Sequence, residues 1–185
     1  REAELKRQIN EFVKCGLLER TSGPYGSPAF LVAKSDQTSR MVIDYQDVNK
    51  DIVCEREPIP IVTDLIDKLG RSRVFSVCDI KTAFHSLRLH PDSRDVTTLT
   101  TPFGQYRYLV VPMGLKTSPA AFTRVIRDIL GDLLDCGVHI YVDDLLIATP
   151  TVDSHIEVLT RLMTRLHSAG VRLNRKKSQW FRNSV

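Results

Sequence analysis

The feature that most constrains this chain is a pair of short apolar runs separated by only three residues. The runs cover residues 138–141 and 145–149, and Val142, Asp143 and Asp144 connect them. Strands joined by so short a connection pair antiparallel, because a parallel crossover needs about a dozen residues or more. The sequence therefore predicts a β-hairpin with two carboxylates at its tip.

A third carboxylate ends an apolar run elsewhere in the chain. Residues 74–79 (VFSVCD) predict a buried strand that ends at Asp79, 64 residues before Asp143. If this strand lies beside the hairpin, three carboxylates meet at one end of a sheet. Hard oxygen ligands of this kind suit Mg²⁺, and two ions ~4 Å apart serve phosphoryl transfer. We expect Asp79 and Asp143 to bridge the metals and Asp144 to bind more weakly. An Asp-Asp pair without such company is more often a solvated turn.

Periodicity and capping residues predict the remaining elements. Helices are expected over residues 1–15, 61–69, 118–136 and 153–169, with Ser118 and Asp153 as caps. Their inward faces are expected to hold Leu5, Ile9, Phe12 and Val13, then Phe122, Val125, Ile126, Ile129, Leu130 and Leu133, then Ile156, Leu159, Leu162, Met163 and Leu166. Further strands are expected over 28–34 and 40–45 (a hairpin), 86–90, 106–111 and 171–174. This order predicts an α+β fold with a largely antiparallel sheet.

Charge is unevenly distributed along the chain. The formal net charge is only +4, but residues 158–185 contain seven Lys or Arg and no Asp or Glu. Such a stretch suits a polyanion, because phosphates neutralised by basic side chains release counterions. A solvated basic face without a ligand is an equally good interpretation of charge alone.

The cysteines and the hydropathy indicate an intracellular protein without a membrane segment. No apolar run reaches 18 residues, and none of the four cysteines forms a C-x-x-C pair. We therefore expect reduced thiols, with Cys78 in the core, and no membrane partner.

The acidic hairpin tip is also part of a motif. Residues 141–144 (YVDD) resemble the Y-x-D-D box of reverse transcriptases. Further matches follow in family order: Ser27-Pro28, Lys34, Arg40 and Asp44-Tyr45 of the fingers hairpin, 79–84 (DIKTAF) of the first acidic motif, 111–119 (VPMGLKTSP) of the P-x-G-x-x-x-[SA]-P motif, and Leu173-Asn174 with Lys176-Lys177 of the late lysine motif. The resemblance covers essentially the whole chain and is strongest to gypsy-type LTR retrotransposons and retroviruses.

The resemblance implies a right-hand polymerase fold without a thumb. Fingers would comprise residues 1–53 and 89–112, and the palm, a ferredoxin-like antiparallel sheet backed by helices, residues 54–88 and 113–185. The thumb, connection and RNase H domains of a parent polyprotein would be missing. Grip on a primer–template duplex would then be weak, which leaves inactivity of the isolated fragment as an open outcome.

The implied activity is RNA-directed DNA synthesis. Two Mg²⁺ ions, or Mn²⁺ in their place, would serve transfer of a nucleotide from a dNTP to a primer 3′-hydroxyl on an RNA or DNA template. The implied location is the cytoplasm, including virus-like particles.

The resemblance also assigns roles to single residues. The catalytic residues would be Asp79, Asp143, Asp144 and the general acid Lys177, with Asp79, Ile80, Asp143 and Asp144 at the metals. The nucleotide would contact Lys34, Arg40, Ile80, Lys81, Ala83, Phe84 and Met113, and primer or template would contact Pro112, Gly114, Lys116 and Tyr141. Phe84 would exclude a ribose 2′-hydroxyl, and backbone N–H groups after Asp79 would form a nest for phosphates.

Several alternatives stay open at this point. Lys and Arg are more commonly solvated in a hairpin than bound to a ligand, so a solvated hairpin is the alternative for Lys34 and Arg40, and a plain core aromatic is the alternative for Phe84. Met113 departs from the Gln or Phe usual in the family, and its thioether cannot donate a hydrogen bond. A second function class is an inactive, domesticated or truncated module that binds nucleic acid or a protein. An RNA-templated RNA polymerase is a third, disfavoured by the YVDD turn and by Phe84.

Overall fold

The computed structural model describes residues 1–34, 37–53, 69–70, 72–141 and 143–184. The chain divides into two compact units. Unit 1 comprises Arg1–Cys54 and Phe84–Ser118, and unit 2 comprises Glu55–Ala83 and Pro119–Val185. The predicted division into fingers and palm has somewhat different boundaries and stays a prediction.

Unit 1 is built on a five-stranded sheet. Its order is β1 (Leu18–Thr21), β6 (Gly104–Tyr108), β5 (Leu99–Thr101), β2 (Ser27–Ala33) and β3 (Ser39–Ile43). All neighbours are antiparallel except β2 and β5. The hairpin β2–β3 confirms one prediction, whereas β1 and β5 were not predicted because four and three residues are too few to show a period.

Helices α1 (Glu2–Lys14) and α2 (Gln46–Asp51) complete unit 1. Leu5 and Ile9 of α1 are buried as predicted, but Val13 is 39% exposed, so its inward placement was wrong. The core cluster of this unit contains Leu18, Ile43, Tyr45, Leu99, Tyr108, Val110 and Leu115.

The predicted strand over residues 86–90 was wrong. Phe84–Ser86 forms a 3-10 turn, and the segment pairs only through an isolated bridge between Arg88 and Val110. A second 3-10 turn begins at Pro91, which has no N–H for a ladder. Too few residues remain between the two turns to form a strand. The side chains of residues 86–90 nevertheless alternate between exposed and half-buried, which is the pattern that suggested one. A third 3-10 turn covers Asp95–Thr97.

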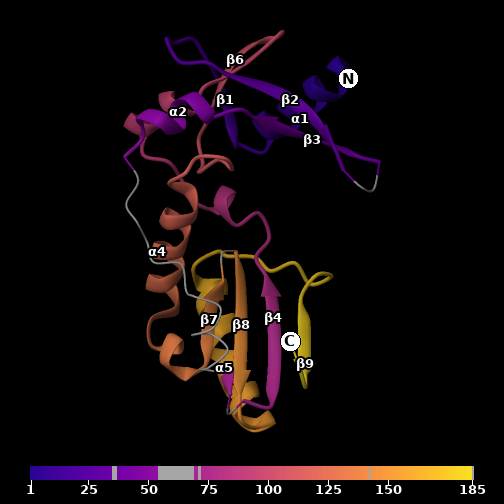
Figure 1. Cartoon of the computed structure of the whole chain (residues 1–185), viewed down its shortest axis with the longest axis vertical. Helices are drawn as coiled ribbons and strands as arrows, with labels where there is room; N and C mark the ends of the chain where they lie inside the picture. The colour runs from indigo at the N-terminus through magenta and orange to yellow at the C-terminus, as the bar shows by residue number, and fades with distance from the viewer. Residues whose placement is uncertain (35–36, 54–68, 71, 142, 185) are drawn as a thin grey trace. The chain divides into compact units, whose positions relative to one another are not determined.

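Unit 2 contains a four-stranded, wholly antiparallel sheet (Figure 1). Its order is β7 (Val138–Tyr141), β8 (Asp144–Thr149), β4 (Val74–Asp79) and β9 (Gln179–Arg182). The predicted acidic hairpin and its neighbour β4 are confirmed. The predicted last strand, 171–174, was misplaced, since only Leu173 forms a bridge there, to Ile80. The outer strand β9 is mostly exposed and therefore shows no hydrophobic alternation.

The helices of unit 2 are α4 (Ser118–Leu130) and α5 (Val152–Ser168). The single helix predicted to residue 136 ends early, at Leu130, because Gly131 has φ of 51° and a 3-10 segment, Gly131–Cys136, follows. The cap of α5 is Thr151, which forms a capping box with Ser154, so the predicted cap, Asp153, was two residues too late. The expected helix over 61–69 lies outside the described residues except for Leu69.

Two positions of the apolar stripes predicted for α4 and α5 face outward. Val125 of α4 is 36% exposed and Ile156 of α5 is 51% exposed, whereas Phe122, Ile126 and Leu162 are buried as expected. Both exposed residues lie at the margin of their stripe, where a helical period alone does not fix how far a partner covers the helix. No helix among the described residues combines the length and apolar character needed to cross a bilayer.

Gly137 is required where β7 begins. Its φ is +90°, and a Cβ there would stand 2.2 Å from the carbonyl oxygen of Ala148. The Gly137 carbonyl accepts a hydrogen bond from the Ala148 N–H at 2.9 Å. Only glycine permits this close approach, which aligns β7 with β8.

A buried polar chain joins β4, β8, α5 and β9. His155 of α5 is fully buried, with Nε2 2.8 Å from Ser76 Oγ and Nδ1 2.8 Å from Thr149 Oγ1. The Thr149 hydroxyl donates to the Thr151 carbonyl, so it accepts from Nδ1–H, and the Ser76 hydroxyl then donates to Nε2. Ser76 Oγ in turn accepts from the Phe181 N–H at 3.1 Å. Burial lowers the pKa of His155, which fits its neutral form.

Candidate active site

The ends of β4 and β8 bring two carboxylates side by side. Asp79 is the last residue of β4, Asp144 is the first of β8, and the register pairs them directly. Residues opposite each other on antiparallel strands lie on the same face, with Cβ atoms about 5 Å apart. Tyr141 of β7 pairs with Asp144 from the other side and is 41% exposed. The sheet therefore brings Asp79, Asp144 and Tyr141 together where the strands β4, β8 and β7 meet at one end of the sheet.

The third carboxylate, Asp143, occupies the exposed turn between the strands. The pKa of Asp144 is raised above its ordinary value, first by burial and then by the negative charges of Asp143 and Asp79, while Lys177 acts in the opposite direction. Burial and the two like charges both disfavour the ionised form of Asp144. This corner of the sheet would therefore be stabilised by a cation.

Lys177 is held against this corner by a turn that follows α5. The Asn174 N–H donates to the Asp79 carbonyl at 2.8 Å, and the Asp79 N–H donates to Ser178 Oγ at 3.2 Å. Ser178 also donates to the Asn174 carbonyl at 2.9 Å. Lys177 Nζ lies 3.6 Å from Asp79 Oδ2, with its side chain 70% exposed. The sequence did not indicate that Asn174 and Ser178 fasten this turn, because the contacts bridge about a hundred residues.

The segment after Asp79 differs from the expected phosphate nest. The Lys81 N–H donates to the Arg172 carbonyl at 2.8 Å, so this amide of the nest is already engaged. Thr82 has a φ of 53°, a strained conformation for a β-branched residue. Ile80 and Ala83 are buried, at 5% and 3% exposure, so their side chains are not open to a ligand. Phe84 is half-buried and belongs to unit 1.

The donor set fits a hard divalent cation. Among the described residues no three His, Cys, Asp or Glu side chains are already gathered closely enough to hold a metal ion. Mg²⁺, however, keeps several waters and takes one or two carboxylates plus substrate phosphates. Asp79 and Asp144 side by side, with Asp143 next in the chain, supply oxygen donors of that kind.

Unit 1 contains a pocket lined by the predicted nucleotide-binding cations. Its volume is about 460 Å³, and Lys34, Arg40, Met113 and Gly114 line it. Lys34 and Arg40 come from β2–β3 and its turn, and both side chains are exposed. Met113 is 54% exposed, so it offers an apolar surface without a hydrogen-bond donor. The structure thus brings together three of the predicted nucleotide-binding residues and Gly114, which was predicted to contact primer or template.

The predicted primer or template segment is clamped by a residue that sequence reasoning missed. Asn49 of α2 donates through Nδ2 to the Gly114 carbonyl at 2.8 Å and accepts at Oδ1 from the Lys116 N–H at 2.9 Å. Ser118 was expected to cap α4. Its hydroxyl instead donates a hydrogen bond to the Pro112 carbonyl at 2.7 Å. An Asn in a helix carries no distinguishing pattern, so only the tertiary structure identifies the clamp.

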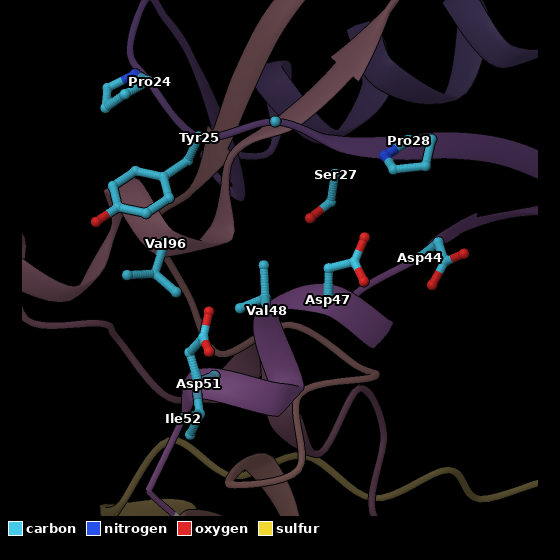
Figure 2. Close-up of a pocket in the computed structure, with 11 residues that line it drawn as sticks. Pro24, Tyr25, Ser27, Pro28, Asp44, Asp47, Val48, Asp51, Ile52 and Val96 are labelled. Carbon is cyan, nitrogen blue, oxygen red and sulfur yellow. The ribbon is translucent and has the colours of Figure 1, made fainter.

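A second pocket of unit 1 differs in charge. It measures about 470 Å³, and Asp44, Asp47 and Asp51 line it together with apolar residues. Figure 2 shows Asp47 and Asp51 on α2, with Tyr25 and Val96 on the facing side. Three carboxylates repel a triphosphate. The pocket of Lys34 and Arg40 is therefore the better nucleotide site of the two.

Proteins similar to this chain include polyproteins of mobile elements and viral reverse transcriptases. The chain is 31% identical to the retrovirus-related Pol polyprotein from transposon 297 of Drosophila melanogaster, over 100% of this chain and 18% of that protein. It is 30% identical to the transposon Tf2-3 polyprotein of Schizosaccharomyces pombe, over 96% of this chain and 13% of that one. The chain thus spans less than a fifth of these relatives.

Solved structures give the same result for the fold. A foamy viral protease–reverse transcriptase in complex with double-stranded DNA matches with a TM-score of 0.89 and 29% identity, covering 100% of this chain and 32% of that one. The same viral protein in complex with an RNA/DNA hybrid matches with a TM-score of 0.89. The α+β fold predicted from the sequence is confirmed as that of fingers and palm. The family model for reverse transcriptase (RNA-dependent DNA polymerase) matches residues 32–185. The chain belongs to the reverse transcriptase family.

Proposed function

We propose that this chain is the catalytic core of an RNA-directed DNA polymerase. The reaction joins a primer 3′-oxygen to the α-phosphorus of a dNTP and breaks the bond from that phosphorus to the pyrophosphate leaving group. The observation that carries the proposal is the register of Asp79 opposite Asp144, next to Asp143, in a corner short of positive charge. Reverse transcriptases are generally divalent-metal enzymes, and this corner suits such ions.

Asp79, Asp143 and Asp144 would hold two Mg²⁺ ions, with Mn²⁺ as a substitute. When bound, these ions would supply charge stabilisation for the attacking and leaving oxygens. The charges of Asp79 and Asp143 repel that of Asp144, which supports a role of these carboxylates in binding cations. Ile80 is proposed to sit beside the metals through the backbone that follows Asp79.

Lys177 is proposed to donate a proton to the departing pyrophosphate. A general acid needs a group that is held near the reaction and can release a proton. The turn that fastens Asn174 and Ser178 to the end of β4 supports this role, because it holds the Lys177 ammonium 3.6 Å from Asp79.

In unit 1, Lys34 and Arg40 are proposed to bind the triphosphate of the dNTP. Arg forms paired hydrogen bonds to phosphate oxygens and Lys acts as a point charge. Their shared pocket and the apolar Met113 support a site that attracts the phosphates and packs against the rest of the nucleotide. Lys81, Phe84 and the backbone of Ala83 are proposed to complete nucleotide binding, with Phe84 selecting against ribose.

Primer and template are proposed to contact Tyr141, Pro112, Gly114 and Lys116. The foamy viral relative is described in complex with double-stranded DNA and with an RNA/DNA hybrid, which supports RNA or DNA as the template here. The basic stretch over residues 158–185 supports phosphate contacts.

Primer extension tests the proposal. The protein that carries this chain should extend a DNA primer on an RNA template with dNTPs and Mg²⁺ or Mn²⁺, and Asp143→Asn should abolish extension. Glu157→Gln, on the exposed face of α5, is a matched acid-to-amide control and should extend like wild type. Equal extension by Asp143→Asn would refute the metal assignment. An inert wild type would favour the alternative of an inactive, nucleic-acid-binding module.

A further inference from the structure

One side chain of α1 bonds the backbone of an edge strand in unit 1. β3 lies at the end of its sheet and pairs only with β2, so one side of its backbone has no neighbouring strand. Gln8 covers that side. Its Nε2 donates to the Ser39 carbonyl at 2.8 Å, and its Oε1 accepts from the Met41 N–H at 2.8 Å. This is the pattern in which a parallel strand bonds the two residues that flank its partner.

The orientation of the Gln8 amide is fixed by its surroundings. Nε2 also donates to Glu4 Oε1 at 2.7 Å, and Gln8 is only 9% exposed. Arg7 holds the Glu4 carboxylate, with Nη2 2.7 Å from Oε1. A flipped amide would set its oxygen against the Ser39 carbonyl and the Glu4 carboxylate, so only one orientation satisfies every partner.

The two bonded residues flank Arg40. Arg40 itself pairs with Val32 of β2, so the backbone is held by the sheet at Arg40 and by Gln8 at the positions on either side. Gln8 also lines the same 460 Å³ pocket as Lys34, Arg40 and Met113. The amide therefore fixes the exposed edge at the point from which the Arg40 side chain extends.

We propose that Gln8 is a positioning residue for nucleotide binding, whose amide holds the β3 backbone so that Arg40 is presented to the triphosphate of a dNTP. The proposal rests on the function proposed above for Arg40. An unsupported edge strand frays, and a side chain on it must be ordered when the ligand binds. A strand fixed in advance avoids that cost, so binding is tighter without a further contact to the ligand.

The alternative is that Gln8 only covers the sheet edge. In that case its loss lowers stability but leaves the affinity for dNTP unchanged. The two roles differ in how Gln8 and Arg40 combine, because residues that act through one another give non-additive effects.

A double-mutant cycle in primer extension makes the distinction. Gln8→Met keeps the length of the side chain and removes both hydrogen bonds to β3. We expect it to raise the KM for dNTP about tenfold with kcat within about twofold of wild type. Arg40→Ala should raise this KM roughly 10- to 100-fold. In the Arg40→Ala background, Gln8→Met should add less than about twofold, because nothing remains to be positioned. An equal effect of Gln8→Met in both backgrounds would overturn the proposal, as would a fall in kcat at constant KM.

A stability control separates packing from positioning. Ile9→Val removes one methylene from a fully buried residue beside Gln8 on α1 and leaves the clamp intact. This variant should lower the melting temperature without changing the KM for dNTP. If Ile9→Val raised that KM as much as Gln8→Met does, the effect would belong to stability and the proposal would fall.

Hydrogen exchange gives a readout that needs no catalysis. The Met41 amide should exchange slowly in wild type, because Gln8 Oε1 accepts its hydrogen, and faster in Gln8→Met, while the Val42 amide serves as an internal reference. Unchanged exchange at Met41 would show that the clamp is absent in solution.

The outcomes distinguish this inference from the proposed function. An unaffected KM in Arg40→Ala, with activity still dependent on Asp143, would leave the polymerase standing and refute the positioning role. A wild type that neither binds dNTP nor extends a primer would refute both.

Discussion

The hairpins β2–β3 and β7–β8 have the same topology but opposite surroundings. In β7–β8 the strand residues are buried almost throughout, with Leu145 and Ile147 fully inaccessible to solvent. In β2–β3 the side chains of Phe30 and Val32 are 46% and 37% exposed. Each hairpin stands at one end of its sheet, β7–β8 beside β4 and β2–β3 beside β5, so burial and not position in the sheet distinguishes them.

The difference shows two ways of presenting charge. Burial along β7–β8 supplies stability that offsets the repulsion among Asp79, Asp143 and Asp144 at its tip. The side chains of β2–β3 bury little apolar surface, and two hydrogen bonds from the Gln8 amide hold the outer side of β3 instead. A well-packed hairpin can tolerate unsatisfied charge, whereas an exposed hairpin relies on specific hydrogen bonds.

The largest expected effects are kinetic, and they differ between the acidic end of β7–β8 and the basic end of β2–β3. Asp79→Asn should lower kcat by roughly a thousandfold or more, since removal of a metal ligand forfeits several kcal/mol of transition-state stabilisation, at about 1.4 kcal/mol per tenfold. Lys34→Ala should mainly raise the KM for dNTP. Steady-state primer extension measures both values. A large kcat effect from Lys34→Ala, or a pure KM effect from Asp79→Asn, would break the assignment of chemistry to one hairpin and binding to the other.

Core truncation tests the difference in burial directly. Ile147→Ala in β8 should cost about 2–5 kcal/mol of unfolding free energy, because it leaves a cavity in a packed sheet. Val32→Ala in β2 is the matched change on the exposed hairpin and should cost about 0.5 kcal/mol or less. Denaturant titration of both variants checks the comparison, which would collapse if the two losses were equal.

The buried chain through His155 should contribute less than the apolar core but more than any surface residue. Ser76→Ala leaves His155 Nε2 and the Phe181 N–H without this partner and should cost about 1–3 kcal/mol. Ser168→Ala, at the exposed end of α5, is the control and should change little. Thermal unfolding measures both. A loss no larger than that of the control would mean that water replaces the hydroxyl at no cost.

The smallest expected effect is stabilising and depends on pH. Asp144→Asn removes a like charge opposite Asp79 and should raise the unfolding free energy by about 0.2–1 kcal/mol at pH 7. The pKa of Asp144 is raised above 3.8 in the folded state, so the folded state binds the proton more tightly. Stability contributed by protonated Asp144 is therefore present at low pH and lost as pH rises through the raised pKa. The advantage of Asp144→Asn should accordingly shrink as pH falls towards 3.8. An advantage that grew in acid would contradict the sign of this shift.

The amino-acid sequence by itself determined the hairpin of β7 and β8, the strand β4, the helices α1, α4 and α5, and the family. These features depend on local information: the period of apolar residues, a connection too short for a parallel crossover, and motifs in a fixed order. The three carboxylates were predicted because acids at the ends of apolar strands are an unusual local setting, whereas Lys34 and Arg40 were predicted only from the resemblance to the family. The exact roles of the three carboxylates stay predictions.

Only the tertiary structure decided how these residues are supported. The register that pairs Asp79 with Asp144, the turn that brings Lys177 to Asp79, and the clamps of Asn49 and Gln8 all join segments far apart in sequence. Side-chain amides and hydroxyls bond whatever backbone folds next to them, so their partners leave no pattern in the sequence. The strands β1, β5 and β9 were missed for a related reason: a short strand is stabilised by its neighbours, and its own residues carry too little periodicity to reveal it.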